Sequence, residues 1–431
     1  MDLPSKHVLD LSKRIGARGA GTDGESAAAS YVLRAFSEFD IEVDVETFST
    51  WKSDLPALAI ICILAIVAYL VFRVDYTLSV VLAAIVWLLF QMETYSWGII
   101  SKLMPHSSAT NVLGKVKPSE DPRQLVVLAA NYDTAKGSPL GRPGIARAYR
   151  VLYIVAFTCV TLIGILSIFG LVASLLKLSR QAISITWAAF APAPAFLFVA
   201  AFLILMGEFR GMYTAGANDN GSGVAVMLSA MSSLAEKPLE HTTVWGVATA
   251  RGFAGGRGMV ALLGRHRSSL KHAFIVNIDH VGRGGANVIT REGPMLGFRA
   301  SRKLRKIALM AADRSRSLQV KKGKCRVKKS DAMVATVRGY KAITIGGTRG
   351  GTYDGWHNEG DAYDRIQRAS LDRAVKFVEI LLDEIDSIAG EGKRATSRKV
   401  HEVEDSERED LAKESPNLDD PKHSEREGRF S

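Results

Sequence analysis

The hydrophobic pattern divides the chain into two kinds of sequence. Residues 55–72, 77–92, 151–176 and 182–206 form four apolar stretches that contain no Asp, Glu, Lys or Arg. A helix needs about 20 residues to cross roughly 30 Å of hydrocarbon, so the last two stretches are long enough, the first is at the lower limit and the second is short. We therefore predict four transmembrane helices. Buried core helices are the alternative, mainly for the earlier pair.

Short connections, residues 73–76 and 177–181, join the stretches in pairs and predict two membrane hairpins over residues 55–92 and 149–206. Each hairpin returns the chain to the side that it left, so the rest of the sequence shares one side. The domain-side flanks carry seven basic residues against three in the connections: Lys52, Lys102, Lys136, Arg142, Arg147, Arg150 and Arg210 against Arg73, Lys177 and Arg180. The first 50 residues contain no signal-peptide apolar region. We expect an integral, multi-pass membrane protein whose soluble domain is cytoplasmic.

Outside the hairpins, apolar runs alternate with helical patterns. Residues 125–130, 242–249, 273–278 and 340–345 have the continuous apolar character of buried parallel strands. Residues 224–234 and 371–385 follow the three-four spacing of a helix with one buried face. This alternation predicts an α/β fold with a mostly parallel central sheet flanked by helices, built from residues 1–54, 93–148 and 207–390. Residues 391–431 are charged and without period, which predicts a disordered tail.

Composition and charge narrow the possible partners. Apolar residues make up 47% of the 431 residues, as in globular proteins, and three cysteines exclude a disulfide framework. The net charge is +11, and residues 299–329 contain 13 Lys and Arg against one acid, Asp313. A solvated helix face is the favoured interpretation of this stretch, and contact with anionic lipid headgroups of the bilayer is the alternative. It contains no aromatic residue for base stacking, so we expect no nucleic-acid partner.

Polar residues follow the predicted strands, where ligands of open α/β sheets gather. Asn131, Tyr132 and Asp133 follow the first strand. The next two strands are followed by Arg251-Gly252 and Asp279-His280, and Trp356-His357 come after the last one. A glycine-rich segment, GANDNGSG at residues 216–223, precedes the predicted helix over residues 224–234.

These segments resemble the co-catalytic zinc aminopeptidase family, which includes bacterial leucyl aminopeptidases, glutamate carboxypeptidase and the transferrin receptor. The resemblance rests on five motifs in family order: RGAGTDGESA at residues 18–27, GANDNGSGVAVML at 216–228, NID at 277–279, Ser330-Asp331, and His357 with Gly360-Asp361 and residues 364–366. It implies that Asp219 bridges two zinc ions, that Asp279 is a second carboxylate ligand and that His357 is the last histidine ligand.

This chain departs from the family pattern at positions that the family uses for zinc binding and general-base catalysis. The family has His-x-Asp where this chain has Asn131-Tyr132-Asp133, and Glu-Glu, a general base and a zinc ligand, where it has Arg251-Gly252. Arginine stays protonated and cannot act as the base. By the resemblance each zinc keeps two protein ligands, whereas catalytic zinc normally has three. We therefore expect either no cofactor or weakly bound zinc.

Without metals the remaining carboxylates need another counter-charge. We predict that Arg251 supplies it through contacts to Asp219 or Asp279, with Asp133 behind them. The opposing interpretations make Asp219 a helix cap, Asp279 a turn residue and Arg251 a surface arginine. Two further alternatives stay open, an ordinary loop position for His357 and substitute metal ligands at His280 and Glu359.

Three functions are compatible with this pattern. The favoured one is a membrane protein whose peptidase-like domain is catalytically impaired and binds or scaffolds a peptide or protein. The second is an active zinc-dependent aminopeptidase with an altered site that hydrolyses N-terminal residues of peptides. The third is a channel or transporter subunit, which the absence of ionisable residues in the apolar stretches disfavours.

Overall fold

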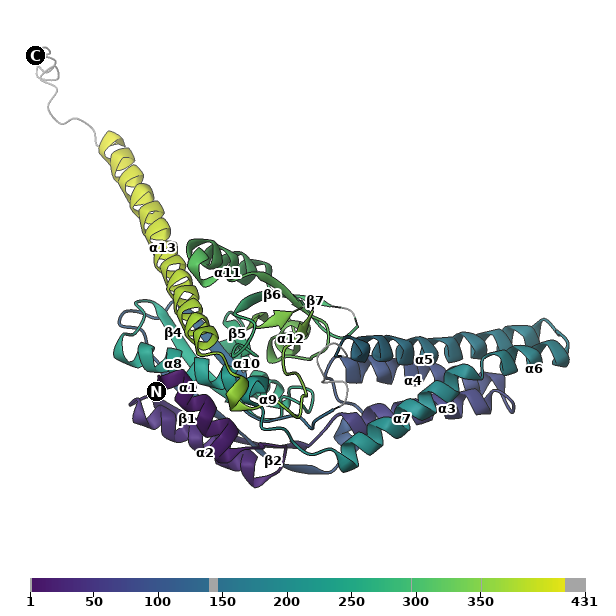
Figure 1. The fold of residues 1–431 in the computed structure, drawn as a ribbon. Helices are drawn as coiled ribbons and strands as arrows, with labels where there is room; N and C mark the ends of the chain where they lie inside the picture. Colours follow the sequence, from purple (N-terminus) through teal and green to yellow (C-terminus); the bar gives the residue numbers. More distant parts are fainter. Residues whose placement is uncertain (1, 139–145, 296, 350, 415–431) are drawn as a thin grey trace, which may run out of the picture.

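The structure, a computed structural model, describes residues 2–138, 146–295, 297–349 and 351–414. It consists of an α/β domain and a bundle of long helices that projects from one end of it (Figure 1). The helices of the domain are α1 Leu3–Leu9, α2 Asp23–Glu38, α8 Ser222–Glu236, α9 Arg257–Arg265, α10 Arg267–Leu270, α11 Arg302–Arg314, α12 Asp331–Val337 and α13 Arg368–Glu414. Those of the bundle are α3 Leu55–Val71, α4 Tyr76–Thr94, α5 Ala146–Leu175, α6 Arg180–Ala189 and α7 Pro192–Arg210.

A nine-stranded sheet forms the centre of the described domain, in the order β1-β2-β4-β3-β5-β9-β6-β7, with β8 paired to β6. Its strands are β1 Glu42–Trp51, β2 His106–Val116, β3 Gln124–Asn131, β4 Thr242–Thr249, β5 Phe274–Asp279, β6 Asn287–Glu292, β7 Phe298–Arg299, β8 Lys322–Cys325 and β9 Lys341–Gly346. A separate pair, β10 Thr348–Arg349 and β11 Thr352–Tyr353, lies outside it. The four central strands β4, β3, β5 and β9 are parallel, whereas β1, β2, β6 and β7 pair antiparallel. The sheet is therefore mixed rather than mostly parallel.

Helices cover both faces of the sheet, as alternating residues of β3 show. Val126 and Leu128 belong to the apolar cluster that includes α8 and α13, while Val127 and Ala129 pack with residues of α9 and α12. Because both faces are buried, the central strands are continuous apolar runs, as the sequence indicates. The four predicted strands are confirmed to within one residue and the predicted helix over residues 224–234 to within two, whereas the one over residues 371–385 is part of the longer α13.

Both pairs of long helices leave the domain at the same edge of the sheet. Helices α3 and α4 connect β1 to β2, which pair antiparallel from Glu42 with Lys115 to Trp51 with His106. Helices α5 to α7 follow β3, and a bridge between Lys136 and Tyr213 closes that insertion. Since β1 runs parallel to β4 through the intervening β2, both insertions lie at the carboxyl ends of the central strands. The edge that bears the candidate site therefore faces the helical bundle.

The bundle has apolar side chains inside and outside. Three described helical segments are long and apolar enough to cross a membrane, Tyr76–Thr94, Ala148–Leu175 and Arg180–Arg210, and the apolar helix Leu55–Val71 is shorter. Large apolar side chains such as Ile85, Ile168 and Phe202 are about half exposed on its surface. A helix that is apolar all round is typical of burial in lipid. The predicted count of four spans stays a prediction, because three segments meet the length.

Proline divides the fourth apolar stretch into α6 and α7. Pro192 is the first residue of α7, where its missing N–H costs nothing, and α6 ends at Ala189. The prediction of a single helix over residues 182–206 is corrected in this respect. Arg142, one of the flanking basic residues, lies outside the described residues.

The tail differs from the sequence-based expectation. Helix α13 continues to Glu414, so residues 391–414 are helical rather than disordered, and residues 415–431 lie outside the described part. The helical segment is rich in Ala, Glu, Lys and Arg, which have high intrinsic helix propensity.

The basic stretch 299–329 does not form one surface. Arg302, Lys303 and Lys306 are exposed on α11, which is set back from the start of the bundle (Figure 1). Lys328 and Lys329, in contrast, are engaged in ion pairs inside the molecule. Contact of the exposed cations with anionic lipid stays a prediction.

Candidate functional site

The candidate site lies where β4, β3 and β5 end side by side. Asn131 is the last residue of β3, Arg251 follows β4 and Asp279 ends β5. Asp219 comes from the kinked segment Ala217–Gly221 that leads into α8. The side chains of Asp219 and Asp279 are brought together, as expected, and share two positively charged or ionisable partners.

Buried polar contacts hold the kinked segment Ala217–Gly221 in place. The backbone N–H groups of Asn218 and Asp219 donate to the Asp361 carboxylate at 2.8–3.1 Å. Asp361 also pairs with Arg283 at 2.7 Å. The fully buried guanidinium of Arg18 donates to the carbonyls of Gly216 and Tyr132, among others, and so ties the segment to the end of β3.

Asp219 does not cap helix α8. The carboxamide oxygen of Asn220 accepts the N–H of Gly223 at 3.1 Å and that of His280 at 3.1 Å. The carboxylate of Asp219 is thereby left to the site, where it accepts the backbone N–H of His357 at 3.2 Å. The helix-cap interpretation of Asp219 is therefore wrong.

Lys328 places an ammonium group between the two carboxylates. Its Nζ lies 3.1 Å from Oδ1 of Asp219 and 2.9 Å from Oδ2 of Asp279. The Lys328 side chain is only 5% exposed and its ammonium lies 4.7 Å from the centre of the Phe253 ring. Burial opposes the charge, but the carboxylates of Asp219 and Asp279 raise the pKa of Lys328 above its usual value. Burial alone would raise the pKa of Asp219 and Asp279, but the charges of Lys328 and His280 lower the pKa of both aspartates. Lys328 and the two aspartates are therefore all ionised at neutral pH.

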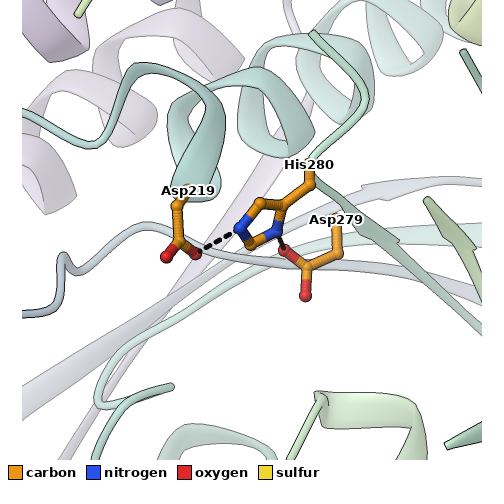
Figure 2. A group of neighbouring side chains, drawn as sticks. All are labelled: Asp219, Asp279 and His280. Carbon is orange, nitrogen blue, oxygen red and sulfur yellow. Dashed lines mark hydrogen bonds and ion pairs between the residues drawn. The ribbon is translucent and has the colours of Figure 1, made fainter. Parts of the chain in front are cut away.

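His280 forms a second bridge between the same carboxylates (Figure 2). Its Nε2 lies 3.1 Å from Oδ1 of Asp219 and its Nδ1 lies 2.6 Å from Oδ1 of Asp279. The ring is fully buried and stacks on Tyr353 at a centroid distance of 4.3 Å. Burial disfavours the imidazolium, but the two carboxylates outweigh it and raise the pKa of His280 to about 9. Two cations thus balance two carboxylates.

Arg251 is turned away from this group. Its Nε lies 2.8 Å from Oε1 of Glu25, and its Nη2 donates to Ser107 at 3.0 Å and to the Ser108 carbonyl at 2.8 Å. The predicted counter-ion role of Arg251 is therefore corrected, since Lys328 has that place. The reason is that Glu25, a buried carboxylate on α2, itself needs a cation. The surface interpretation of Arg251 is also wrong, because its side chain is 0% exposed.

The other altered positions are satisfied without a metal. The side-chain amide of Asn131 donates to Asp133 at 3.1 Å, and its oxygen accepts from Asn220 at 3.3 Å. Asp133 also accepts the backbone N–H groups of Gly252 at 2.9 Å and Phe253 at 3.2 Å. Gly252 has no side chain to offer. Asp133 therefore holds the ends of β3 and β4 together.

His357 lies beside the group rather than within it. Its imidazole stacks on Trp356 at a centroid distance of 4.2 Å and packs edge-on against Phe253 at 5.3 Å. Burial lowers its pKa to about 4, so the ring is neutral at physiological pH. Glu359, the other possible substitute ligand, is exposed.

A two-zinc centre does not fit these residues. Among the described residues, the His, Cys, Asp and Glu side chains close enough to share an ion are Asp219, Asp279 and His280, whose ligand atoms lie within 4.8 Å of one another. An ion bound to the two carboxylates would compete with the ammonium of Lys328, which contacts both. The altered residues Asn131 and Gly252 offer no replacement ligand.

Sequence reasoning missed Lys328 and underrated His280. The available signal was a lysine pair directly before Ser330-Asp331, together with the need of two retained aspartates for positive charge. Ser330 caps α12 through the N–H of Met333, and Asp331 accepts from Thr249 at 2.5 Å, so this motif positions the segment that carries Lys328.

Known proteins share the fold of this chain, and one family profile matches part of its sequence. A sequence profile described as Peptidase family M28 matches residues 202–381. No curated protein sequence matches the chain. The zinc aminopeptidase BSAP from Bacillus subtilis superimposes with a TM-score of 0.52 at 13% identity, covering 89% of this chain and 94% of that one.

Two further solved structures are similar to the same extent. A Zn-dependent exopeptidase from Parabacteroides distasonis has a TM-score of 0.51 at 13% identity, covering 89% of this chain and 97% of its own. The glutaminyl cyclase of Bacteroides thetaiotaomicron, bound to N-acetylhistamine, has a TM-score of 0.51 at 12% identity with the same coverage. At these identities the likeness establishes the zinc aminopeptidase fold.

Proposed function

We propose that the chain is a membrane-embedded member of peptidase family M28 that has lost hydrolytic activity and serves as a binding or scaffolding module for a peptide or protein. The match over residues 202–381 and the shared fold support the family. The apolar bundle supports the membrane location.

The contacts of Arg251 carry this proposal. The residue stands where the family has its general base, and its guanidinium is bonded to Glu25, Ser107 and the Ser108 carbonyl. Hydrolysis of an amide by a metal-bound water needs a proton acceptor that titrates near the working pH. Arginine cannot take up that proton. The next residue, Gly252, has no side chain, so neither position of the family's Glu-Glu pair retains its chemistry.

The orientation of the domain supports a role close to the bilayer. The carboxyl edge of the central strands faces the bundle, and ion pairs bridge the two at Lys329 with Asp54 and at Lys136 with Glu208. A ligand held at this edge would lie near the surface of the membrane. We place the domain on the cytoplasmic side because of the basic flanks of the apolar segments.

An activity assay tests the proposal. We expect the purified full chain, in detergent and with added Zn²⁺, to release no product from a panel of aminoacyl-p-nitroanilides, nor to cyclise a peptide with N-terminal glutamine. Turnover that is abolished by Asp219→Ala would overturn the proposal, since contaminating enzymes would be unaffected by this substitution.

An altered but active aminopeptidase is the second candidate. The observation in its favour is that Asp219, Asp279 and His280 converge within 4.8 Å, which is a possible set for a single ion. The same assay decides, because this candidate requires zinc-dependent release of N-terminal residues.

The side of the membrane is open to a labelling test. The three native cysteines are buried, so a cysteine introduced at the exposed position Ser26 would report on the domain. We expect the Ser26→Cys variant in intact cells to resist a membrane-impermeant maleimide and to react after lysis. Labelling in intact cells would place the domain outside.

A further inference from the structure

The two site carboxylates are neutralised by groups of the chain itself. Asp219 and Asp279 are almost fully buried and come from different elements, the segment before α8 and the end of β5. Buried carboxylates that approach one another need compensating positive charge. Here the ammonium of Lys328 contacts one oxygen of Asp219 at 3.1 Å and both oxygens of Asp279 at 2.9 and 3.0 Å. It stands in the position that a metal ion bridging the two would need.

His280 completes a set of three potential ligands. Its two ring nitrogens lie 3.1 Å from Asp219 and 2.6 Å from Asp279. His280 is held by stacking of its ring on Tyr353 and by the hydrogen bond that its backbone N–H donates to the carboxamide oxygen of Asn220. Carboxylate oxygen and imidazole nitrogen are both zinc ligands, and catalytic zinc keeps three protein ligands and an open position.

We propose that Asp219, Asp279 and His280 form a latent single-zinc site whose resident cation is the tethered ammonium of Lys328. This inference deepens the proposed loss of hydrolysis, because it names what fills the centre. This set of ligands differs from the two-metal pattern implied by the sequence. His280 is a ligand that the pattern does not contain, the ligand positions now occupied by Asn131 and Gly252 stay lost, and His357 is not a ligand.

The tether gives Lys328 an advantage over a free ion. Its ammonium is carried by the short segment between β8 and α12, which is held by the cap of Ser330 on α12 and by the ion pair of Lys329 with Asp54. Phe253 contributes a cation–π contact at 4.7 Å. An intramolecular cation acts at a high effective concentration, so zinc must displace a bonded, pre-positioned group. The native chain should therefore bind zinc poorly.

Substitution of Lys328 by an uncharged residue of similar length should open the site. We compare the full chain with Lys328→Met, Lys328→Arg and the exposed-lysine control Lys321→Met, each freed of metal by chelation. Zinc binding is measured by equilibrium dialysis with elemental analysis, and Co²⁺ is used as a spectroscopic probe. We expect Lys328→Met to bind one zinc, roughly 100-fold more tightly than the native chain, because the intramolecular competitor is gone. Lys328→Arg and Lys321→Met should behave as the native chain does.

The contribution of His280 is the sharpest part of the test. Adding His280→Ala to Lys328→Met should reverse most of the gain in affinity and change the visible spectrum of bound Co²⁺. An unchanged affinity in the double variant would overturn the proposed ligand set. Tight zinc in the native chain, or no gain in folded Lys328→Met, would overturn the proposal as a whole.

Folding of Lys328→Met provides a second measurement. The variant leaves two buried carboxylates with one cation fewer, so we expect it to be less stable in chelator and to be stabilised by added zinc in proportion to occupancy. Failure to fold with and without zinc would count against the proposal. Native chain that is inactive yet holds zinc would defeat this inference alone, whereas turnover by the native chain would defeat the proposed function.

Discussion

Lys328 and Lys329 are consecutive residues whose ammonium groups bind carboxylates in different parts of the molecule. Lys328 lies between Asp219 and Asp279 in the site, whereas Lys329 lies 2.5 Å from Asp54, directly before α3. Lys329 also donates to the carbonyl of Glu93, near the end of α4, at 3.1 Å. Two adjacent side chains therefore join the candidate site to both ends of the first helical hairpin.

Loss of the ion pair between Lys329 and Asp54 should weaken the junction between the α/β domain and the first helical hairpin. Lys329→Met leaves Asp54 without its cation, and we expect a loss of roughly 2 kcal/mol, below the range for fully buried pairs because both side chains keep some exposure. Thermal unfolding of the full chain in detergent measures the effect. Lys322→Met, an exposed lysine in the same stretch, is the control and should change little. Equal effects of the two substitutions would contradict the role of Lys329.

The central strands could be predicted because burial on both faces leaves a direct trace in the sequence. The apolar run at residues 125–130 forms strand β3, Gln124–Asn131, and the polar residues after it lie at the carboxyl edge of the sheet, as predicted. Strand β1, at the edge of the sheet, and its neighbour β2 contain more exposed positions and no such run, so the antiparallel part of the sheet was not foreseen.

The counter-ion of the site depends on side-chain direction, which the sequence pattern does not carry. Arg251 follows β4 as expected, but its partner Glu25 lies 226 residues earlier in the chain. Lys328 was one of 13 cations in residues 299–329, and only the path of the chain from β8 to α12 distinguishes it. The retained aspartates predicted that a cation was required, though not which one.

The pair of Arg251 and Glu25 should be strongly coupled. Arg251→Met leaves the buried carboxylate of Glu25 unpaired, and we expect a loss of about 3–5 kcal/mol in unfolding free energy. Glu25→Gln combined with Arg251→Met removes both charges and should recover part of this loss. Urea unfolding of the two single variants and the double variant gives the coupling energy. A double variant whose loss equals the sum of the single losses would show that the pair does not interact.

The proposed membrane location rests on the exposed apolar surface of the bundle. Ile165 and Ile168 on α5 are 53% and 55% exposed, so lipid is the surrounding that suits them. Replacing both by arginine should cost about 3 kcal/mol per residue at the centre of a span. We expect the double variant to lose resistance to alkaline carbonate extraction, while replacement of both by leucine keeps it. Native chain that is released by carbonate would contradict the membrane assignment.

Glu292 should make stability fall as the pH rises through neutrality. This residue ends β6, is buried and accepts a hydrogen bond from the Ser330 hydroxyl. Burial raises the pKa of its carboxyl from 4.5 to about 7 in the folded protein. In the unfolded chain the group ionises near its ordinary value, so the unfolded state loses its proton at lower pH than the folded state does. Stability from this group is therefore complete below about pH 4.5 and is lost as the pH rises through 7.

Comparison with Glu292→Gln isolates this contribution. The neutral amide resembles the protonated carboxyl and cannot ionise, so the unfolding free energy of the variant should rise relative to that of the native chain by about 2.5 kcal/mol between pH 5 and pH 8. Urea unfolding at several pH values in this range measures the difference, which cancels the titration of all other groups that the two proteins share. Glu38→Gln, at an exposed glutamate on α2, should follow the native curve. Parallel curves for the native chain and Glu292→Gln would mean that Glu292 is already ionised in the fold and is held by a cation not assigned to it.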